Sequence, residues 1–252
     1  MTTCNVFVSD VAAGNPCGVV QLDSWLPDSD LLRITKDIGL PVTSFVKQCD
    51  GKLYIRWFSL HSEINLCGHG SLGAGAVILS RCDFHEVTFD SQYGQVCIFR
   101  QADSFAITLP TWKAKPSSLH RALADTVSDV VEVFHTRDLV LVLPSVDDVR
   151  QFSPAPETLL QIPNHHAIIV TAKQGDCGYV LRYFAPKIGI DEDIATGSAQ
   201  CSLAPYWFEK LGKTKLEVTQ LSPTGGYFQV QKASKKTITV MANVSFRDSV
   251  SQ

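Results

Sequence analysis

Hydrophobic and polar residues alternate in short segments along most of the chain, a pattern typical of a strand-rich protein. One segment differs, because Leu31, Ile34 and Ile38 recur at helical spacing. Residues 28–30 could cap this helix and Gly39 could end it. A second helix, made of small residues, is predicted over 68–79. Apolar runs between turn residues predict strands at 4–8, 18–22, 44–48, 53–58, 86–89, 95–100 and 104–109.

The second half of the chain repeats this order of elements. A helix is predicted to open at Thr196-Gly197-Ser198-Ala199 and to end before Gly212. The pattern predicts strands at 130–134 and 139–143, helical turns at 146–152 and 156–162, and strands at 167–171, 179–184, 216–221, 227–231 and 237–244.

Local sequence also supports an internal duplication. Arg56-Trp57-Phe58 matches Arg182-Tyr183-Phe184, and a glycine-led helix start follows each segment. Prolines and serines interrupt the pattern between the halves. We therefore expect two similar lobes, residues 1–113 and 114–252.

Composition narrows the classes of protein. Among 252 residues, 45% are hydrophobic and 19% are charged, which suits a packed core. The net charge of -3 argues against nucleic-acid and anionic-membrane partners. We see no apolar run of roughly 20 residues and no secretory signal after Met1. Eight scattered cysteines without a Cys-x-x-Cys pair favour reduced thiols and a cytoplasmic protein, and no motif predicts a metal site.

The two glycine-led helix starts are the candidate chemical site. A helix start presents unpaired backbone N–H groups and the positive end of the helix dipole, so it can hold a carboxylate or a developing oxyanion. Pseudo-twofold packing would direct both starts at one cleft. The first contains Gly68, Gly70 and Ser71, and the second contains Gly197 and Ser198.

Groups able to move protons flank both starts. Cys67 and His69 lie at the first, and Glu192 and Asp193 precede the second. Each has a structural alternative. Cys67 could be a buried thiol, His69 a core or capping histidine, and Asp193 a simple helix cap.

Four other motifs carry less weight. Gly70-Ser71-Leu72-Gly73 lacks the glycine two residues before the serine that a nucleophile elbow needs. The glycines from Gly70 to Gly75 have the wrong order for a dinucleotide fingerprint. Gly14-Asn15-Pro16 predicts a turn, and adjacent His165 and His166 would point to opposite faces of a strand.

At this point the chain resembles the PhzF-like (phenazine-biosynthesis isomerase) family. The resemblance rests on Gly14-Asn15-Pro16, Arg56-Trp57-Phe58, Glu63 to Gly70, Arg182 to Pro186, Glu192 to Ala199 and Ser222 to Gly226. It implies an α+β diaminopimelate-epimerase-like fold of two pseudo-symmetric lobes, each a curved mixed β-sheet wrapped around a central helix. It also implies proton transfer without a cofactor, on a small-molecule carboxylate substrate, often in a homodimer.

One departure from the family matters. Val42 stands where the family's phenazine isomerase has its catalytic glutamate, and valine cannot move a proton. Related epimerases use two cysteines; Cys67 matches the first, whereas the second position falls near Thr196. Asp193, His69 and Cys67 remain as the expected catalytic groups. The expected substrate-binding residues are Asn15, Gly68, Gly70, Ser71, Thr196, Gly197 and Ser198.

Two functions follow from these residues. The first is an isomerase or epimerase that shifts a proton on a small carboxylate-bearing metabolite. The alternative is a binding protein of the same fold that has lost catalysis together with the glutamate replaced by Val42.

Overall fold

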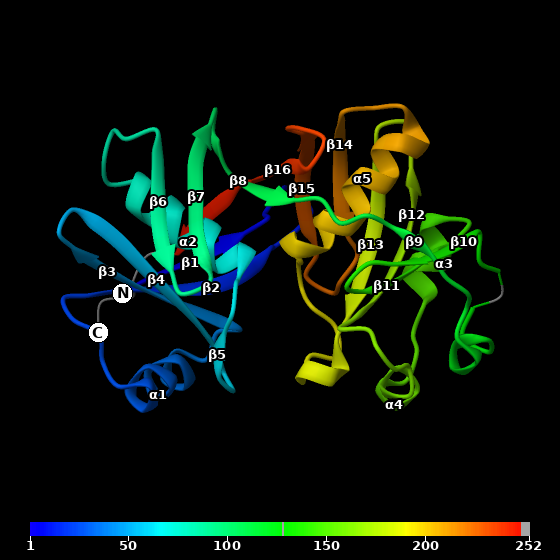
Figure 1. Cartoon of the computed structure of the whole chain (residues 1–252), viewed down its shortest axis with the longest axis horizontal. Coiled ribbons are helices and arrows are strands. Elements are labelled where there is room, and N and C mark those ends of the chain that lie inside the picture. The colour runs from blue at the N-terminus through cyan, green and yellow to red at the C-terminus, as the bar shows by residue number, and fades with distance from the viewer. Residues whose placement is uncertain (128, 248–252) are drawn as a thin grey trace. The chain divides into compact units, whose positions relative to one another are not determined.

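The computed structural model describes residues 1–127 and 129–247. The chain forms two compact units (Figure 1). Unit 1 comprises Met1–Thr108 and the C-terminal segment from Met241, and unit 2 comprises Leu109–Val240. Strand β17 (Val244–Arg247) belongs to unit 1 because it pairs antiparallel with β1 (Thr2–Val6). The two predicted lobes, residues 1–113 and 114–252, stay a prediction.

Unit 1 is built on a mixed sheet with two parallel crossovers. Its other elements are β2 (Asn15–Leu22), α1 (Asp28–Ile38), β3 (Val42–Cys49), β4 (Lys52–Ser59), β5 (Glu63–Ile64), α2 (Gly68–Leu79), β6 (Glu86–Ser91), β7 (Gly94–Gln101) and β8 (Ser104–Pro110). Strands β2 and β3 are parallel across α1, and β4 and β6 are parallel across α2. The pairs β3–β4 and β6–β7 are antiparallel.

Unit 2 repeats this order. It contains β9 (Lys115–Pro116), η1 (Arg121–Leu123), β10 (Glu132–His135), β11 (Leu139–Val142), α3 (Val146–Gln151), α4 (Pro156–Leu160), β12 (Ile168–Gln174), β13 (Gly178–Phe184), η2 (Pro186–Ile188), η3 (Gly197–Ala199), α5 (Gln200–Leu211), β14 (Lys215–Gln220), β15 (Gly226–Lys232) and β16 (Thr237–Ala242). Strands β11 and β12 are parallel across α3 and α4, and β13 and β14 are parallel across α5. This repeat confirms the predicted α+β fold with a duplicated lobe.

The central helix of unit 1 is covered on nearly all sides. Helix α2 packs against β1, β2, β3, β6 and β7. Small residues allow this close approach: a Cβ atom on Gly73 would lie 2.4 Å from the Cys17 sulfur, and one on Gly75 would lie 2.5 Å from Ile98. Both distances are shorter than any real carbon contact, so larger residues cannot occupy these positions.

The helix ends follow the sequence in part. Gly39 and Gly212 adopt the left-handed conformation with φ of 69° and 63° and end α1 and α5, as predicted. The predicted cap of α1 is wrong, because the N-cap is Pro27 and Asp28 already belongs to the helix. In its first turn Asp28 instead faces the positive end of the helix dipole.

Two predicted segments are divided differently in the structure. The predicted turn at 14–16 is confined to Gly14 (φ 74°), because Asn15 is already the first residue of β2. The predicted strand 237–244 ends at Ala242. The carbonyl of Asn243 accepts hydrogen bonds from the backbone of Phe7 and Val8, at 3.0 and 3.3 Å, and thereby leaves the ladder.

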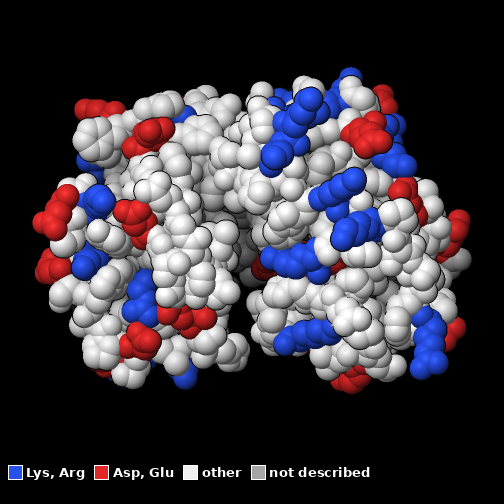
Figure 2. Space-filling view, viewed as in Figure 1, with Lys and Arg blue, Asp and Glu red and all other residues white. Residues whose placement is uncertain are grey.

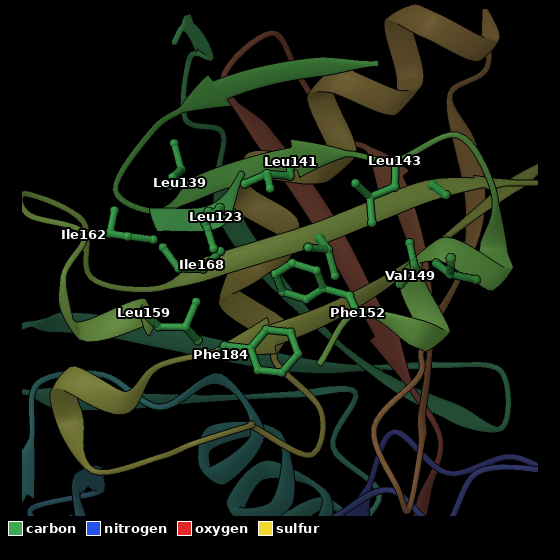
Figure 3. Packing of buried hydrophobic residues seen from close by; sticks show 13 residues of the cluster. Leu123, Leu139, Leu141, Leu143, Val149, Phe152, Leu159, Ile162, Ile168 and Phe184 are labelled. Carbon is green, nitrogen blue, oxygen red and sulfur yellow. The ribbon is translucent and has the colours of Figure 1, made fainter. Parts of the chain in front are cut away.

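Unit 2 has a compact apolar core between its sheet and the short helices α3 and α4 (Figure 3). Phe152 and Phe184 pack edge to face with their ring centroids 5.4 Å apart. Burial of each large side chain contributes about 1.5–3 kcal/mol. This core fixes β13, the strand that leads to the polar residues described below. No helix in the described part of the chain is long and apolar enough to cross a membrane.

Candidate functional site

Cys67 organises the start of α2 in unit 1. It adopts an extended backbone as the N-cap, and its sulfur accepts a hydrogen bond from the Gly70 N–H at 3.3 Å. The Ser71 hydroxyl donates to the Cys67 carbonyl at 2.6 Å. The Cys67 sulfur and the Ser71 hydroxyl therefore both stabilise the first turn of α2.

The same sulfur also lies beside an imidazole. Cys67 Sγ and His69 Nδ1 share a hydrogen bond of 3.3 Å. Cys67 is 6% exposed, while His69 is partly exposed. A thiol and an imidazole in contact can pass a proton between them, which is the arrangement that activates a thiol for acid–base chemistry.

The two glycines of this helix start differ in their surroundings. No heavy atom of the described chain lies within 4 Å of the position that a Cβ atom on Gly68 would take. A Cβ atom on Gly70 would meet Ser44 Oγ at 2.8 Å and Val42 Cγ1 at 3.2 Å. Ser44 Oγ also donates to the Gly70 carbonyl at 2.9 Å. Gly70 is therefore a packing residue, and Gly68 leaves room for a ligand.

The residue that replaces the family glutamate lies at this helix start. Val42 is 6% exposed and packs beside Gly70. A longer acidic side chain at this position would reach the first turn of α2. Valine supplies only an apolar wall at this position.

Buried groups lie beneath the same helix. Asn15 is fully buried on β2, opposite Val6 of β1 and in a strand that contacts α2. The sulfurs of Cys4 and Cys17 lie 3.5 Å apart. The hydrogen bond with Cys4, together with burial, raises the pKa of Cys17 well above its usual value. The Cys17 thiol is therefore a neutral packing group.

Unit 2 contains the second group of predicted residues. The Asp193 carboxylate accepts a hydrogen bond from the Thr196 hydroxyl at 2.6 Å, and the Asp193 N–H donates to the Tyr183 carbonyl at 2.9 Å. Asp193 is partly exposed, whereas Thr196 is 7% exposed. The carboxylate is thus held in a defined position while part of the residue reaches solvent.

Gln220, at the end of β14, was not predicted from the sequence. Its side-chain oxygen accepts from the Thr196 N–H at 2.8 Å, and its amide nitrogen donates to the Asp193 carbonyl at 2.6 Å. Gln220 is fully buried. It therefore clamps both ends of the turn that carries Asp193. In the sequence, Gln220 is only a polar residue near the end of a predicted strand.

Gly197 and Ser198 open a short 3₁₀ turn, and α5 begins three residues later than Gly197, at Gln200. The predicted single helix from residue 196 is therefore corrected to a 3₁₀ turn followed by a helix. Within residues 1–127 and 129–247, the N–H groups of Gly197 and Ser198 donate no hydrogen bond. Both remain available to an oxygen of a ligand.

A second group missed by the sequence lies next to Ser198. Arg137 Nη2 is 3.5 Å from Ser198 Oγ and 3.0 Å from the Tyr183 hydroxyl. Burial raises the pKa of Tyr183, so this hydroxyl stays protonated at neutral pH. Burial also raises the pKa of Cys201, in the first turn of α5, to about 12.

No group of three or more His, Cys, Asp or Glu side chains among the described residues is arranged to hold a metal ion.

The predicted residues form two clusters. Unit 1 brings together Cys67, Gly68, His69, Gly70 and Ser71, and unit 2 brings together Asp193, Thr196, Gly197 and Ser198.

Comparison with known proteins finds a matching family model and similar sequences. Residues 4–245 match the family model described as phenazine biosynthesis-like protein. An uncharacterized isomerase of Vibrio cholerae is 55% identical over 243 residues, which cover 96% of this chain and 87% of that protein.

Solved structures extend the comparison to the fold. A putative phenazine biosynthesis PhzC/PhzF protein from Clostridium difficile superposes with a TM-score of 0.92 at 30% identity, over 100% of both chains. A hydroxyproline epimerase from Agrobacterium vitis, with bound trans-4-OH-L-proline, gives a TM-score of 0.54 at 10% identity, over 98% of this chain and 90% of that chain. The second similarity concerns the fold alone.

Proposed function

The chain belongs to the phenazine biosynthesis-like (PhzF) family, whose relatives include proteins named isomerases, and we propose that it shifts a proton on a small carboxylate-bearing metabolite without a cofactor. The hydrogen bond between Asp193 and Thr196 carries this proposal. It holds a partly exposed carboxylate next to two N–H groups that have no acceptor in the described chain. A base beside oxyanion donors is the combination that proton abstraction at carbon requires.

The proposed reaction begins at the carbon next to the substrate carboxylate. Asp193 takes the proton from this carbon, and the electron pair of the C–H bond moves into the carboxylate to form an enolate. The N–H groups of Gly197 and Ser198 stabilise the negative charge on its oxygen. Protonated Asp193 then returns the same proton to a conjugated carbon on the same face, which gives the isomer and restores the Asp193 carboxylate, so atoms and charge balance.

One face of unit 2 carries an excess of basic side chains. In Figure 2 lysine and arginine side chains gather over the displayed face of unit 2, whereas basic and acidic side chains alternate over unit 1. A local excess of positive charge favours the approach of anions.

The roles predicted for unit 1 stay predictions. Cys67 is expected to act as a second acid or base, and His69 is expected to donate to a substrate oxygen. Their shared hydrogen bond supports both roles, because a thiol is activated by an adjacent imidazole. The homodimer and the cytoplasmic location also stay predictions.

Val42 favours a second candidate function. The Val42 side chain packs against Gly70, in the first turn of α2, at the position where a glutamate was expected. A protein with this substitution could bind the carboxylate at the remaining N–H groups and leave it unchanged.

Proton exchange distinguishes the two functions. The purified protein is incubated in deuterated water with amino acids, cyclic amino acids and cyclic hydroxy acids, and loss of the signal of the proton beside the carboxylate is followed by NMR. Enzyme-dependent exchange of at least one compound supports the isomerase. Thermal stabilisation by a compound that does not exchange supports the binding protein.

A further inference from the structure

Arg137 is the most strongly oriented cation near Ser198. It lies between β10 and β11, and Nε and Nη2 donate to the two carboxylate oxygens of Asp138 at 3.1 and 3.0 Å. Its guanidinium also lies 4.7 Å from the centre of the Trp112 ring. With the Tyr183 hydroxyl, three neighbours therefore fix the plane of the guanidinium.

One edge of this guanidinium remains unused. No residue among 1–127 and 129–247 accepts a hydrogen bond from Nη1 of Arg137, although 38% of the side chain is exposed. Nη2 reaches Ser198 Oγ at 3.5 Å, a distance at the limit of a hydrogen bond. The unused edge and the Ser198 hydroxyl thus present donors of the kind that a carboxylate binds.

We propose that Arg137 and Ser198 form the subsite that binds a carboxylate of the substrate. The inference rests on the proposed function, since Ser198 also contributes an N–H group to the proposed site of proton transfer. In this arrangement Nη1 of Arg137 and the Ser198 hydroxyl hold the carboxylate together, and the positive charge selects anions over neutral amides. It would thereby decide which metabolites bind.

A purely structural role would have different consequences. Asp138 is fully buried, and a buried carboxylate needs a partner. If Arg137 only neutralises Asp138, removal of both charges should leave ligand binding unchanged. The double variant Arg137→Gln/Asp138→Asn removes the ion pair without leaving a buried charge, so it separates the two roles.

The test uses succinate as the probe and its neutral diamide as the control, at constant ionic strength. Binding to the full-length protein is measured by calorimetry and by thermal stabilisation. We expect succinate, and not the diamide, to bind the wild-type protein. The double variant should bind succinate at least ~10-fold more weakly, as expected for the loss of a charge-assisted contact. Arg137→Lys should also bind more weakly, because an ammonium lacks the planar fork.

Three results would overturn the inference: no succinate binding by the wild-type protein up to about 50 mM, equal binding by the double variant, or binding of sulfate or phosphate at least ~10-fold tighter than succinate. Asp193→Asn provides the link to the proposed function. Succinate binding should survive in this variant even if proton exchange is lost. If neither the wild-type protein nor any variant exchanges a proton, while the Arg137 variants still bind succinate more weakly, the proposed proton transfer is refuted. The proposed subsite then stands.

Discussion

Arg182 and Glu192 form a two-point ion pair, with Nε to Oε1 at 2.7 Å and Nη2 to Oε2 at 2.9 Å. The two side chains are only 13% and 17% exposed. Unit 1 contains the same pair in Arg56 and Glu63, again with 2.7 Å between Nε and Oε1. In each unit the arginine of the strand before the central helix thus braces the loop that leads to the helix start.

This brace gives the first prediction. Glu192→Gln should lower the free energy of unfolding by roughly 1.5–3 kcal/mol, because a neutral amide cannot accept both charged N–H bonds. The exposed pair of Lys173 and Asp176 provides the control, since these side chains are 51% and 92% exposed. Asp176→Asn should change the free energy by less than about 0.5 kcal/mol. Urea unfolding measures both, and an equal effect of the two substitutions would contradict the brace.

Val42 gives the second prediction. In Val42→Glu, burial should raise the pKa of the new carboxyl above its ordinary value of about 4.3, because desolvation outweighs the helix dipole. Val11→Glu is the control, as Val11 is 90% exposed and a glutamate there should titrate normally. NMR of the side-chain carboxyl carbon gives both values. A normal pKa at residue 42 would mean that the side chain turns to solvent.

Acid should weaken unit 2. Burial, with Arg137 nearby, lowers the pKa of His166, and burial, with His135 nearby, lowers the pKa of His165. The unfolded chain therefore binds more protons than the folded one once the pH falls below about 6.5. Stability should be constant above that pH and should decrease as the pH falls toward the lowered pKa values.

Thermal unfolding between pH 8 and pH 5 tests this sign. His166→Asn should reduce the slope below about pH 6.5, and His85→Asn, at an exposed position, should leave it unchanged. A slope in the His166 variant equal to that of the wild-type protein would assign the acid sensitivity to other groups.

The features predicted correctly from the sequence are those that depend on residues close together along the chain. The repeat of Arg56 and Arg182, the left-handed glycines at Gly39 and Gly212, and the start of α2 were readable, because each depends on neighbours within a few residues. The fold class, which the family resemblance implied, was confirmed.

The contacts that complete the site were not readable in this way. Gln220 clamps Asp193 from 27 residues away, and Arg137 reaches Ser198 from 61 residues away. Nothing in the local pattern around Gln220 or Arg137 distinguishes them from ordinary polar residues at strand ends. Likewise, the pairing of β17 with β1 joins the two ends of the chain and leaves no local signal.

Asp193 gives the last prediction, which is the most direct test of proton transfer. Asp193→Asn keeps the shape of the side chain, and its amide oxygen can still accept the hydrogen bond from Thr196. Asparagine caps a helix start about as well as aspartate, so the variant should stay folded. Its amide cannot accept the substrate proton. If the wild-type protein exchanges a substrate proton, the rate in the variant should fall by roughly 100-fold or more.

Asp191→Asn is the matched control, because Asp191 is exposed two residues away in the same loop. It makes the same change of charge without removing the proposed base, so the variant should retain the wild-type rate. Equal loss in both variants would assign the effect to charge rather than to a base. Near-normal exchange in Asp193→Asn would remove Asp193 from the reaction and transfer the role of base to the Cys67–His69 pair, where Cys67→Ser would then become the decisive substitution.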